Sequence, residues 1–174
     1  MQYNQLIAKL FFITFLGLFF SPLLSEESNK IDGDHQYNFF TGNFDFSDDK
    51  QAALLFGFQH QNESLERDTF LGNVSPITGG FITENSAIYI YSGIEWNVDM
   101  GLFKFTPSFA PGLYNEGNGK DLGHILEFKT EVQLSYGVSE STSFGMSYNH
   151  ISNASLGTKN PGANSYMFNY LQKF

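Results

Sequence analysis

Between residues 126 and 138 the chain alternates between apolar and polar side chains, one position at a time. The even positions are Leu126, Phe128, Thr130, Val132, Leu134, Tyr136 and Val138. The odd positions are Glu127, Lys129, Glu131, Gln133, Ser135 and Gly137. Because successive side chains of a β-strand point to opposite faces of the sheet, this stretch predicts a strand with one apolar face and one polar or charged face.

The same two-residue period predicts further strands along the chain. With the strand just described, expected near residues 124–138, they make seven, and the other six lie near residues 37–46, 52–61, 87–98, 102–114, 142–152 and 165–174. An eighth strand is expected over residues 70–82, although glycine is frequent there and the alternation is weak, because bacterial membrane barrels have an even number of strands. The expected periplasmic turns are residues 62–69, 97–101 and 138–142, and the expected extracellular loops are 46–51, 82–87, 115–123 and 153–164.

Strands with one apolar face fit two architectures. A soluble sandwich or a lipocalin-like binder turns the apolar face inward, whereas a transmembrane barrel turns it outward and keeps a polar interior. Charges on the polar face, strands close to the roughly 9–11 residues that span a bilayer, and an aromatic last strand ending in Phe174 favour the second. We therefore predict an all-β fold, an eight-stranded antiparallel transmembrane β-barrel.

The first 25 residues have the pattern of a signal peptide. Lys9 precedes an apolar stretch over residues 10–20, and Ser25 is a plausible end for cleavage. A membrane anchor is the alternative, but the apolar stretch is short for a span of about 20 residues. Residues 26–174 are then expected to form the barrel domain, in a bacterial outer membrane.

Composition narrows the classes of function. The chain has 18 acidic against 9 basic residues, a net charge of −9, which argues against a nucleic-acid partner. With no cysteine, it cannot be a disulfide scaffold. The four histidines, His35, His60, His124 and His150, are scattered without the spacing of metal ligands, and the glycines form no phosphate-binding loop, so neither a metal nor another cofactor is expected.

The chemistry-bearing pair of the sequence lies at the end of the strand over residues 142–152. Alternation puts His150 and Ser152 on the same face as Phe144, Met146 and Tyr148, which is the predicted lipid face. A serine needs a neighbouring base to become a nucleophile at neutral pH, and a histidine two residues away on the same face can supply it. The alternative is a polar pair with no catalytic role at the rim of the barrel.

The stretch HISNASLGTKNPGANSY, residues 150–166, resembles the active-site segment of lipid A 3-O-deacylases, the PagL family. The preceding GNGKDLGHILEFKTEVQLSYGV is also similar to that family. The resemblance implies an outer-membrane barrel that hydrolyses the 3-position ester of lipid A, with lipopolysaccharide as substrate and membrane lipids around it. It implies Ser152 as nucleophile, His150 as general base, Asn160 in the oxyanion hole, and Asn153 and Gly162 beside the site.

One position departs from the family pattern. Where the family has a glutamate that orients the histidine, this chain has Asn164. An amide can accept the Nδ1–H of an imidazole but brings no full charge. Asp121 or Glu116, in the preceding loop, could supply the acid if that loop folds over the site. A catalytically silent small outer-membrane barrel with a structural or adhesive role is the alternative to the esterase, and a homodimer is left open.

Overall fold

The computed structural model describes residues 35–48, 50–69 and 72–174, and the predicted signal peptide lies outside these residues. The described residues form nine strands and one short 3₁₀ helix, η1 (Glu63–Leu65). The strands are β1 (His35–Phe44), β2 (Ala53–Asn62), β3 (Arg67–Thr69), β4 (Gly72–Thr83), β5 (Ile88–Met100), β6 (Phe103–Asn115), β7 (Leu126–Gly137), β8 (Thr142–Ser152) and β9 (Ala163–Lys173). Among these residues no helix is long and apolar enough to cross a membrane.

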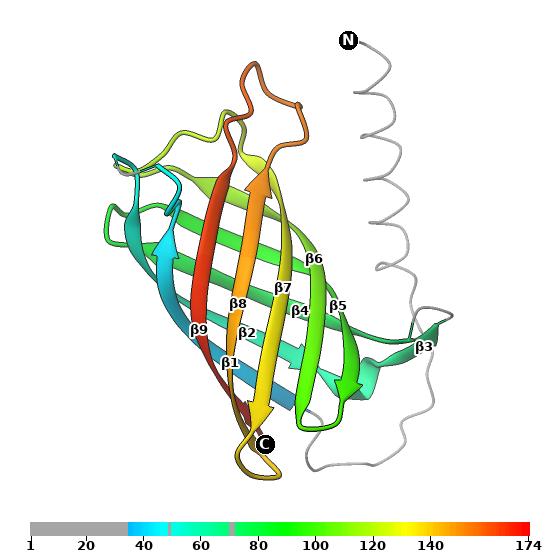
Figure 1. Cartoon of the computed structure of the whole chain (residues 1–174). Helices are drawn as coiled ribbons and strands as arrows, with labels where there is room; N and C mark the ends of the chain where they lie inside the picture. The colour runs from blue at the N-terminus through cyan, green and yellow to red at the C-terminus, as the bar shows by residue number, and fades with distance from the viewer. Residues whose placement is uncertain (1–34, 49, 70–71) are drawn as a thin grey trace. The chain divides into compact units, whose positions relative to one another are not determined.

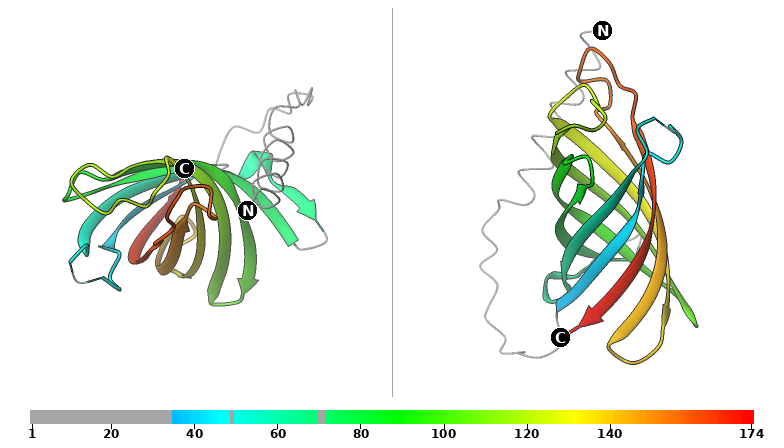
Figure 2. Two further views of the ribbon diagram at one scale, coloured as in Figure 1. Left: turned by 90° about the horizontal axis from the view of Figure 1, so that it is seen from above. Right: turned by 90° about the vertical axis from the view of Figure 1, so that its left-hand side faces the viewer.

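Eight of the strands close into one antiparallel barrel. Sequential neighbours pair from β4 to β9, β9 pairs with β1, β1 with β2, and β2 with β4. Figures 1 and 2 follow these strands around the ring. β3 pairs only with the start of β4, so it extends the wall and does not take part in closure. The eight-stranded barrel is confirmed, and the expected simple turn at 62–69 is wrong because that segment contains η1 and β3.

The connections divide between the two ends of the barrel, as the antiparallel order requires. One end holds the connections after β1, β4, β6 and β8, and the other holds those after β2, β5 and β7. The predicted grouping of loops and turns is therefore the observed one. The connection between β8 and β9, residues 153–162, extends past the ends of its two strands at the top of Figure 1.

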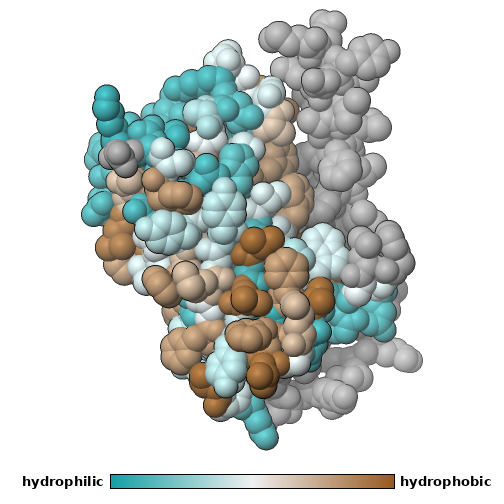
Figure 3. All heavy atoms as spheres, in the orientation of Figure 1, coloured by the Kyte–Doolittle hydropathy of each residue, from teal (hydrophilic) through white to brown (hydrophobic). Residues whose placement is uncertain are grey.

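The apolar faces of the strands point outward. On β7, Glu127 and Lys129 are almost completely buried inside, whereas Val132 and Leu134 are 45% and 47% exposed. Figure 3 shows apolar side chains gathered over the middle and lower wall, with hydrophilic side chains above them. A charged interior with an apolar exterior is the arrangement of a transmembrane barrel and the reverse of a lipocalin-like binder.

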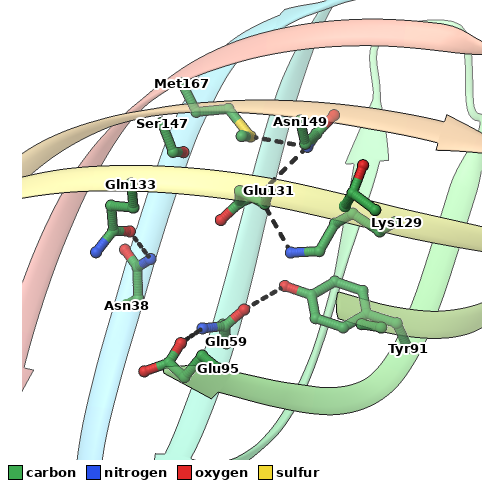
Figure 4. A network of polar contacts seen from close by, with 12 residues as sticks. Asn38, Gln59, Tyr91, Glu95, Lys129, Glu131, Gln133, Ser147, Asn149 and Met167 are labelled. Atoms are coloured by element: carbon green, nitrogen blue, oxygen red, sulfur yellow. Dashed lines mark hydrogen bonds and ion pairs between the residues drawn. The ribbon is translucent and has the colours of Figure 1, made fainter. Parts of the chain in front are cut away.

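Polar side chains bond to one another across the barrel interior (Figure 4). Lys129 Nζ lies 3.2 Å from Glu131 Oε2, and Gln59 joins Tyr91 to Glu95 with hydrogen bonds of 2.9 and 3.0 Å. Buried polar groups are tolerated when they find such partners. The interior is therefore packed by side chains, as expected for a barrel of eight strands.

Apolar side chains also gather inside the barrel, toward the end that holds the connections after β1, β4, β6 and β8. A buried cluster there includes Phe44, Leu55, Phe81, Tyr89 and Ile151, which lie near the ends of five different strands. Such close packing fixes the strand ends, because cores of this density deform little. This cluster also explains the weak alternation of β4, because its inward positions include apolar Ile77 and Phe81.

Candidate active site

His150 and Ser152 lie at the C-terminal end of β8, next to the loop of residues 153–162. The residue between them, Ile151, is completely buried inside the barrel. Tyr148 is 43% exposed on the outer wall, and strand alternation puts His150 and Ser152 on that same outer face. Both residues are partly exposed, on the face of β8 opposite the buried Ile151.

The imidazole of His150 is held by a residue on the neighbouring strand. Asn164 lies directly across from His150 in the β8–β9 register. Its Oδ1 is 2.8 Å from His150 Nδ1 and also accepts a 2.8 Å hydrogen bond from the Tyr148 hydroxyl. The amide thus occupies the position expected from the sequence for the group that orients the histidine.

The partners of Asn164 fix which tautomer the imidazole adopts. The Nδ2 of Asn164 donates to Ser47 Oγ at 3.2 Å, so the amide turns its oxygen, and not its NH₂ group, toward the ring. An oxygen can only accept, which requires a proton on His150 Nδ1. In the neutral ring Nε2 then carries a lone pair, the form that a general base needs.

Gly162 lies against the edge of the imidazole that carries Nε2. A Cβ on Gly162 would be 2.8 Å from His150 Cε1 and 3.3 Å from Nε2, and its φ of +63° is one that L side chains rarely adopt. Only glycine fits both conditions. Ser152 Oγ has no hydrogen-bond partner within the described part of the chain, so the predicted bond between the serine and the imidazole is not formed in this structure.

Asn153 and Asn160 build the loop that follows the serine. The fully buried Asn153 donates from Nδ2 to the carbonyl oxygens of Leu122, at 2.7 Å, and Lys159, at 2.9 Å, which ties this loop to the β6–β7 loop. Its backbone N–H donates to Asn160 Oδ1 at 3.0 Å. The amide oxygen of Asn160 therefore faces the Asn153 backbone, and within the described residues its NH₂ group has no hydrogen-bond partner.

Comparison with known proteins identifies the family. The family model for lipid A 3-O-deacylase, PagL, matches residues 39–172. The chain belongs to the PagL family. Its barrel is similar to solved structures, three of which follow, and no curated protein sequence matches it.

The first of these structures is that of the outer membrane enzyme PagL, with a TM-score of 0.63 and 16% identity over 80% of this chain and 99% of that chain. A de novo designed transmembrane β-barrel has a TM-score of 0.54 and 10% identity, over 84% of this chain and 100% of that chain. Neisserial surface protein A has a TM-score of 0.51 and 12% identity, over 80% of this chain and 96% of that chain. At these identities the likeness concerns the fold, and the family model carries the membership.

The two acids considered as substitutes for the family glutamate have other partners. Asp121 Oδ2 lies 2.6 Å from Lys159 Nζ, and Asp121 Oδ1 accepts from the backbone N–H of Gly123 at 2.7 Å. The Lys159 ammonium and this backbone donor hold the pKa of Asp121 below its usual range. Glu116 is exposed in the same loop. In the described residues neither acid bonds to the imidazole, whose Nδ1 partner in this PagL family member is Asn164.

Three residues that support the site could not be recognised from the sequence in this role. Tyr148 was predicted only as part of the lipid-facing wall, and Asp45 and Ser47 lie more than 100 residues before His150. Lys120 pairs with the buried Asp45 at 2.6 Å. Folding alone brings the β1–β2 loop to the site. Within the described ranges no group of three or more histidine, aspartate or glutamate side chains is arranged to hold a metal.

Proposed function

We propose that this chain hydrolyses the 3-O-linked acyl ester of lipid A by a serine esterase mechanism at the outer-leaflet face of a bacterial outer membrane. The observation that carries the proposal is the hydrogen bond between His150 Nδ1 and Asn164 Oδ1. It leaves Nε2 unprotonated, on a residue two positions from Ser152 along β8. Family membership supplies the substrate class.

In the proposed reaction Ser152 Oγ attacks the ester carbonyl carbon while His150 Nε2 takes the hydroxyl proton. The tetrahedral intermediate collapses when the same proton passes to the 3-oxygen of the sugar, which leaves as a hydroxyl. A water molecule then attacks the acyl-serine, again with His150 as base. Proton return to Ser152 Oγ releases the free fatty acid and restores the enzyme.

The oxyanion of both intermediates needs a donor near Ser152. The backbone N–H of Asn153 already donates to Asn160 Oδ1, so it cannot serve without breaking that bond. The Nδ2 of Asn160 is the donor that this arrangement offers in its place. A preorganised donor of this kind typically contributes about 10²–10³ in rate.

The outward position of the pair suits a substrate that is itself a membrane lipid. Exposed apolar side chains continue down the same face of β8 and β9 from the site. They are Phe144, Met146, Tyr148, Tyr166 and Phe168. An acyl chain can lie along this wall without leaving hydrocarbon, while the sugar stays with the headgroups beside the polar loops.

The amide at position 164 is compatible with turnover. In the Ser-His-Asp template, replacing the acid by an amide costs about 10⁴ in rate, a loss attributed to the wrong tautomer. Here the contact of Asn164 with Ser47 turns the amide oxygen toward the ring, so the tautomer is the productive one. The remaining loss is the full negative charge that would stabilise the imidazolium.

Mass spectrometry of lipid A tests the proposal. Purified protein in detergent micelles is incubated with lipopolysaccharide, and we expect the loss of one 3-hydroxyacyl group. Ser152→Ala should abolish this loss, whereas Ser143→Ala, at the far end of the same strand, should not. An unchanged lipid A spectrum with folded wild-type protein would establish the catalytically silent barrel instead.

The membrane location and the cleavage of the signal peptide are tested in cells that express the protein. We expect the protein in the outer-membrane fraction, with heat-modifiable gel mobility. Its measured mass should be that of a mature chain whose first residue is Glu26. Cross-linking in the isolated membrane would reveal a homodimer. Recovery of the intact residues 1–25 on the membrane-bound protein would contradict the signal peptide.

A further inference from the structure

A chain of hydrogen bonds leads from the imidazole to a buried carboxylate in the β1–β2 loop. His150 Nδ1 bonds to Asn164 Oδ1 at 2.8 Å, and Asn164 Nδ2 donates to Ser47 Oγ at 3.2 Å. Ser47 Oγ in turn donates to Asp45 Oδ1 at 3.4 Å. The other carboxylate oxygen of Asp45 lies 2.6 Å from Lys120 Nζ. Two side chains, Asn164 and Ser47, thus connect the candidate base to a carboxylate that lies far away in the sequence.

The loop that carries Asp45 and Ser47 is docked against β9 by its backbone. The Phe46 N–H donates to the Asn164 carbonyl at 3.1 Å, and the Asn164 N–H points back to Asp45 Oδ1 at 3.4 Å. The Phe46 ring packs on Tyr166 and Tyr148, with centroids 5.1 and 6.3 Å apart. The loop therefore sits on Asn164 through several independent contacts.

The carboxylate determines the direction of every bond in this chain. An ionised carboxylate can only accept, so the single hydroxyl proton of Ser47 is directed to Asp45. Ser47 Oγ can then only accept a hydrogen bond from Asn164, so the amide donates to it from its NH₂ group. The amide oxygen is left facing His150, which in turn requires the proton on Nδ1.

Asp45 is completely buried, and its φ of +50° is one that aspartate adopts more readily than most residues. A buried charge is costly without a partner, and Lys120 supplies one. The Lys120 side chain is itself only 14% exposed. The pair is thus built into the protein beneath the loop and is not a solvated surface contact.

We propose that Asp45 and Ser47 are positioning residues that set the orientation of the Asn164 amide and, through it, the tautomer of His150. The remote carboxylate does through two intermediates what an acid in contact with the ring would do directly. The consequence for turnover rests on the proposed esterase function. The consequence for the tautomer does not, so the two can be tested separately.

The kinetic test uses Ser47→Ala, because Ser47 is exposed and its loss leaves no buried charge. Without the hydroxyl, the amide can present either end to the ring, and we expect kcat to fall about tenfold with KM nearly unchanged. Asp45→Asn should act in the same direction. Asp48→Asn is the matched control: Asp48 lies in the same loop, and among the described residues its side chain bonds only to the backbone N–H of Lys50, so this variant should leave kcat unchanged.

A second background separates positioning from a merely structural role. In Asn164→Asp the residue in contact with the ring is itself acceptor-only, so the tautomer no longer depends on Ser47. Adding Ser47→Ala to that variant should therefore cost much less than the tenfold expected in the wild type. An equal loss in both backgrounds would overturn the proposal, because it would mean that Ser47 only holds the loop.

The tautomer itself is read by ¹⁵N NMR of histidine-labelled protein in micelles, at a pH where the imidazole is neutral. His150→Gln identifies the signals of His150 among the four histidines. We expect the Nδ1–H form in the wild type and a mixture of both forms in Ser47→Ala. An unchanged Nδ1–H form in folded Ser47→Ala would refute the proposal. If the tautomer shifts but the wild type releases no fatty acid, the positioning role stands and the esterase fails.

Discussion

Replacing Gly162 by alanine tests whether the geometry around His150 controls turnover. The new Cβ would lie 2.8 Å from His150 Cε1. Ordinary carbon–carbon contact begins at about 3.5 Å, so the ring must move by roughly 0.7 Å. Since a displacement of about 1 Å in a catalytic group can cost about 10² in rate, we expect kcat to fall by about 10- to 100-fold.

Gly162→Ala also strains the backbone, so a matched control is needed to separate this strain from the contact with the imidazole. Gly101, in the β5–β6 turn, has φ +79°, and a Cβ there would meet nothing within 4 Å. Gly101→Ala therefore carries a similar left-handed cost of about 1–2 kcal/mol without touching the site. Both variants are assayed for release of the acyl chain from lipopolysaccharide, with folding checked by heat-modifiable mobility. Equal kcat values for folded Gly162→Ala and Gly101→Ala would refute the reasoning.

Three further substitutions test the site and the barrel. Tyr148→Phe removes one donor to the amide that orients the imidazole, so kcat should fall up to about tenfold with KM unchanged, and an effect on KM alone would contradict this. Gly57→Ala makes its Cβ collide with the Phe40 ring inside the barrel and should destabilise the fold by about 1–3 kcal/mol, measured as a lower temperature at which the heat-modifiable gel mobility is lost. Because Lys159 lowers the pKa of Asp121, their pair stabilises the loop at and above about pH 4, and its contribution is lost as the pH falls through the lower folded-state value. The small difference in melting temperature between Lys159→Met and wild type should accordingly vanish in acid and persist at neutral pH.

The barrel could be predicted because the bilayer and the β-strand together impose a local pattern. Every strand that spans must present apolar side chains outward, and the two-residue period carries this requirement into the sequence, as in β7 and β8. β4 was predicted only by parity, because its inward positions pack against the apolar cluster and so lack the polar signal. β3 and η1 were missed, since three-residue elements leave no period to detect.

In the candidate site too, the sequence could indicate some residues, whereas other contacts are seen only in the structure. Alternation put His150 and Ser152 on one face, and the resemblance to the family singled out Asn164. The sequence placed Asn164 in the loop 153–164, whereas the structure has it in β9, directly across from His150. No local pattern could show that Asn164 Oδ1 also accepts from Tyr148, or that its Nδ2 reaches Ser47.

The sequence by itself determined which faces of the strands are apolar, because that depends only on the order of residues along each strand. The tertiary structure alone decided the direction of the hydrogen bonds around the imidazole. That direction depends on Asp45, which barrel closure through the β1–β9 pairing brings to Asn164 from 119 residues away. The carboxylate of Asp45 acts on residues that are close to it in space and far from it in the sequence. The residues around Asn164 in the sequence therefore do not reveal this partner.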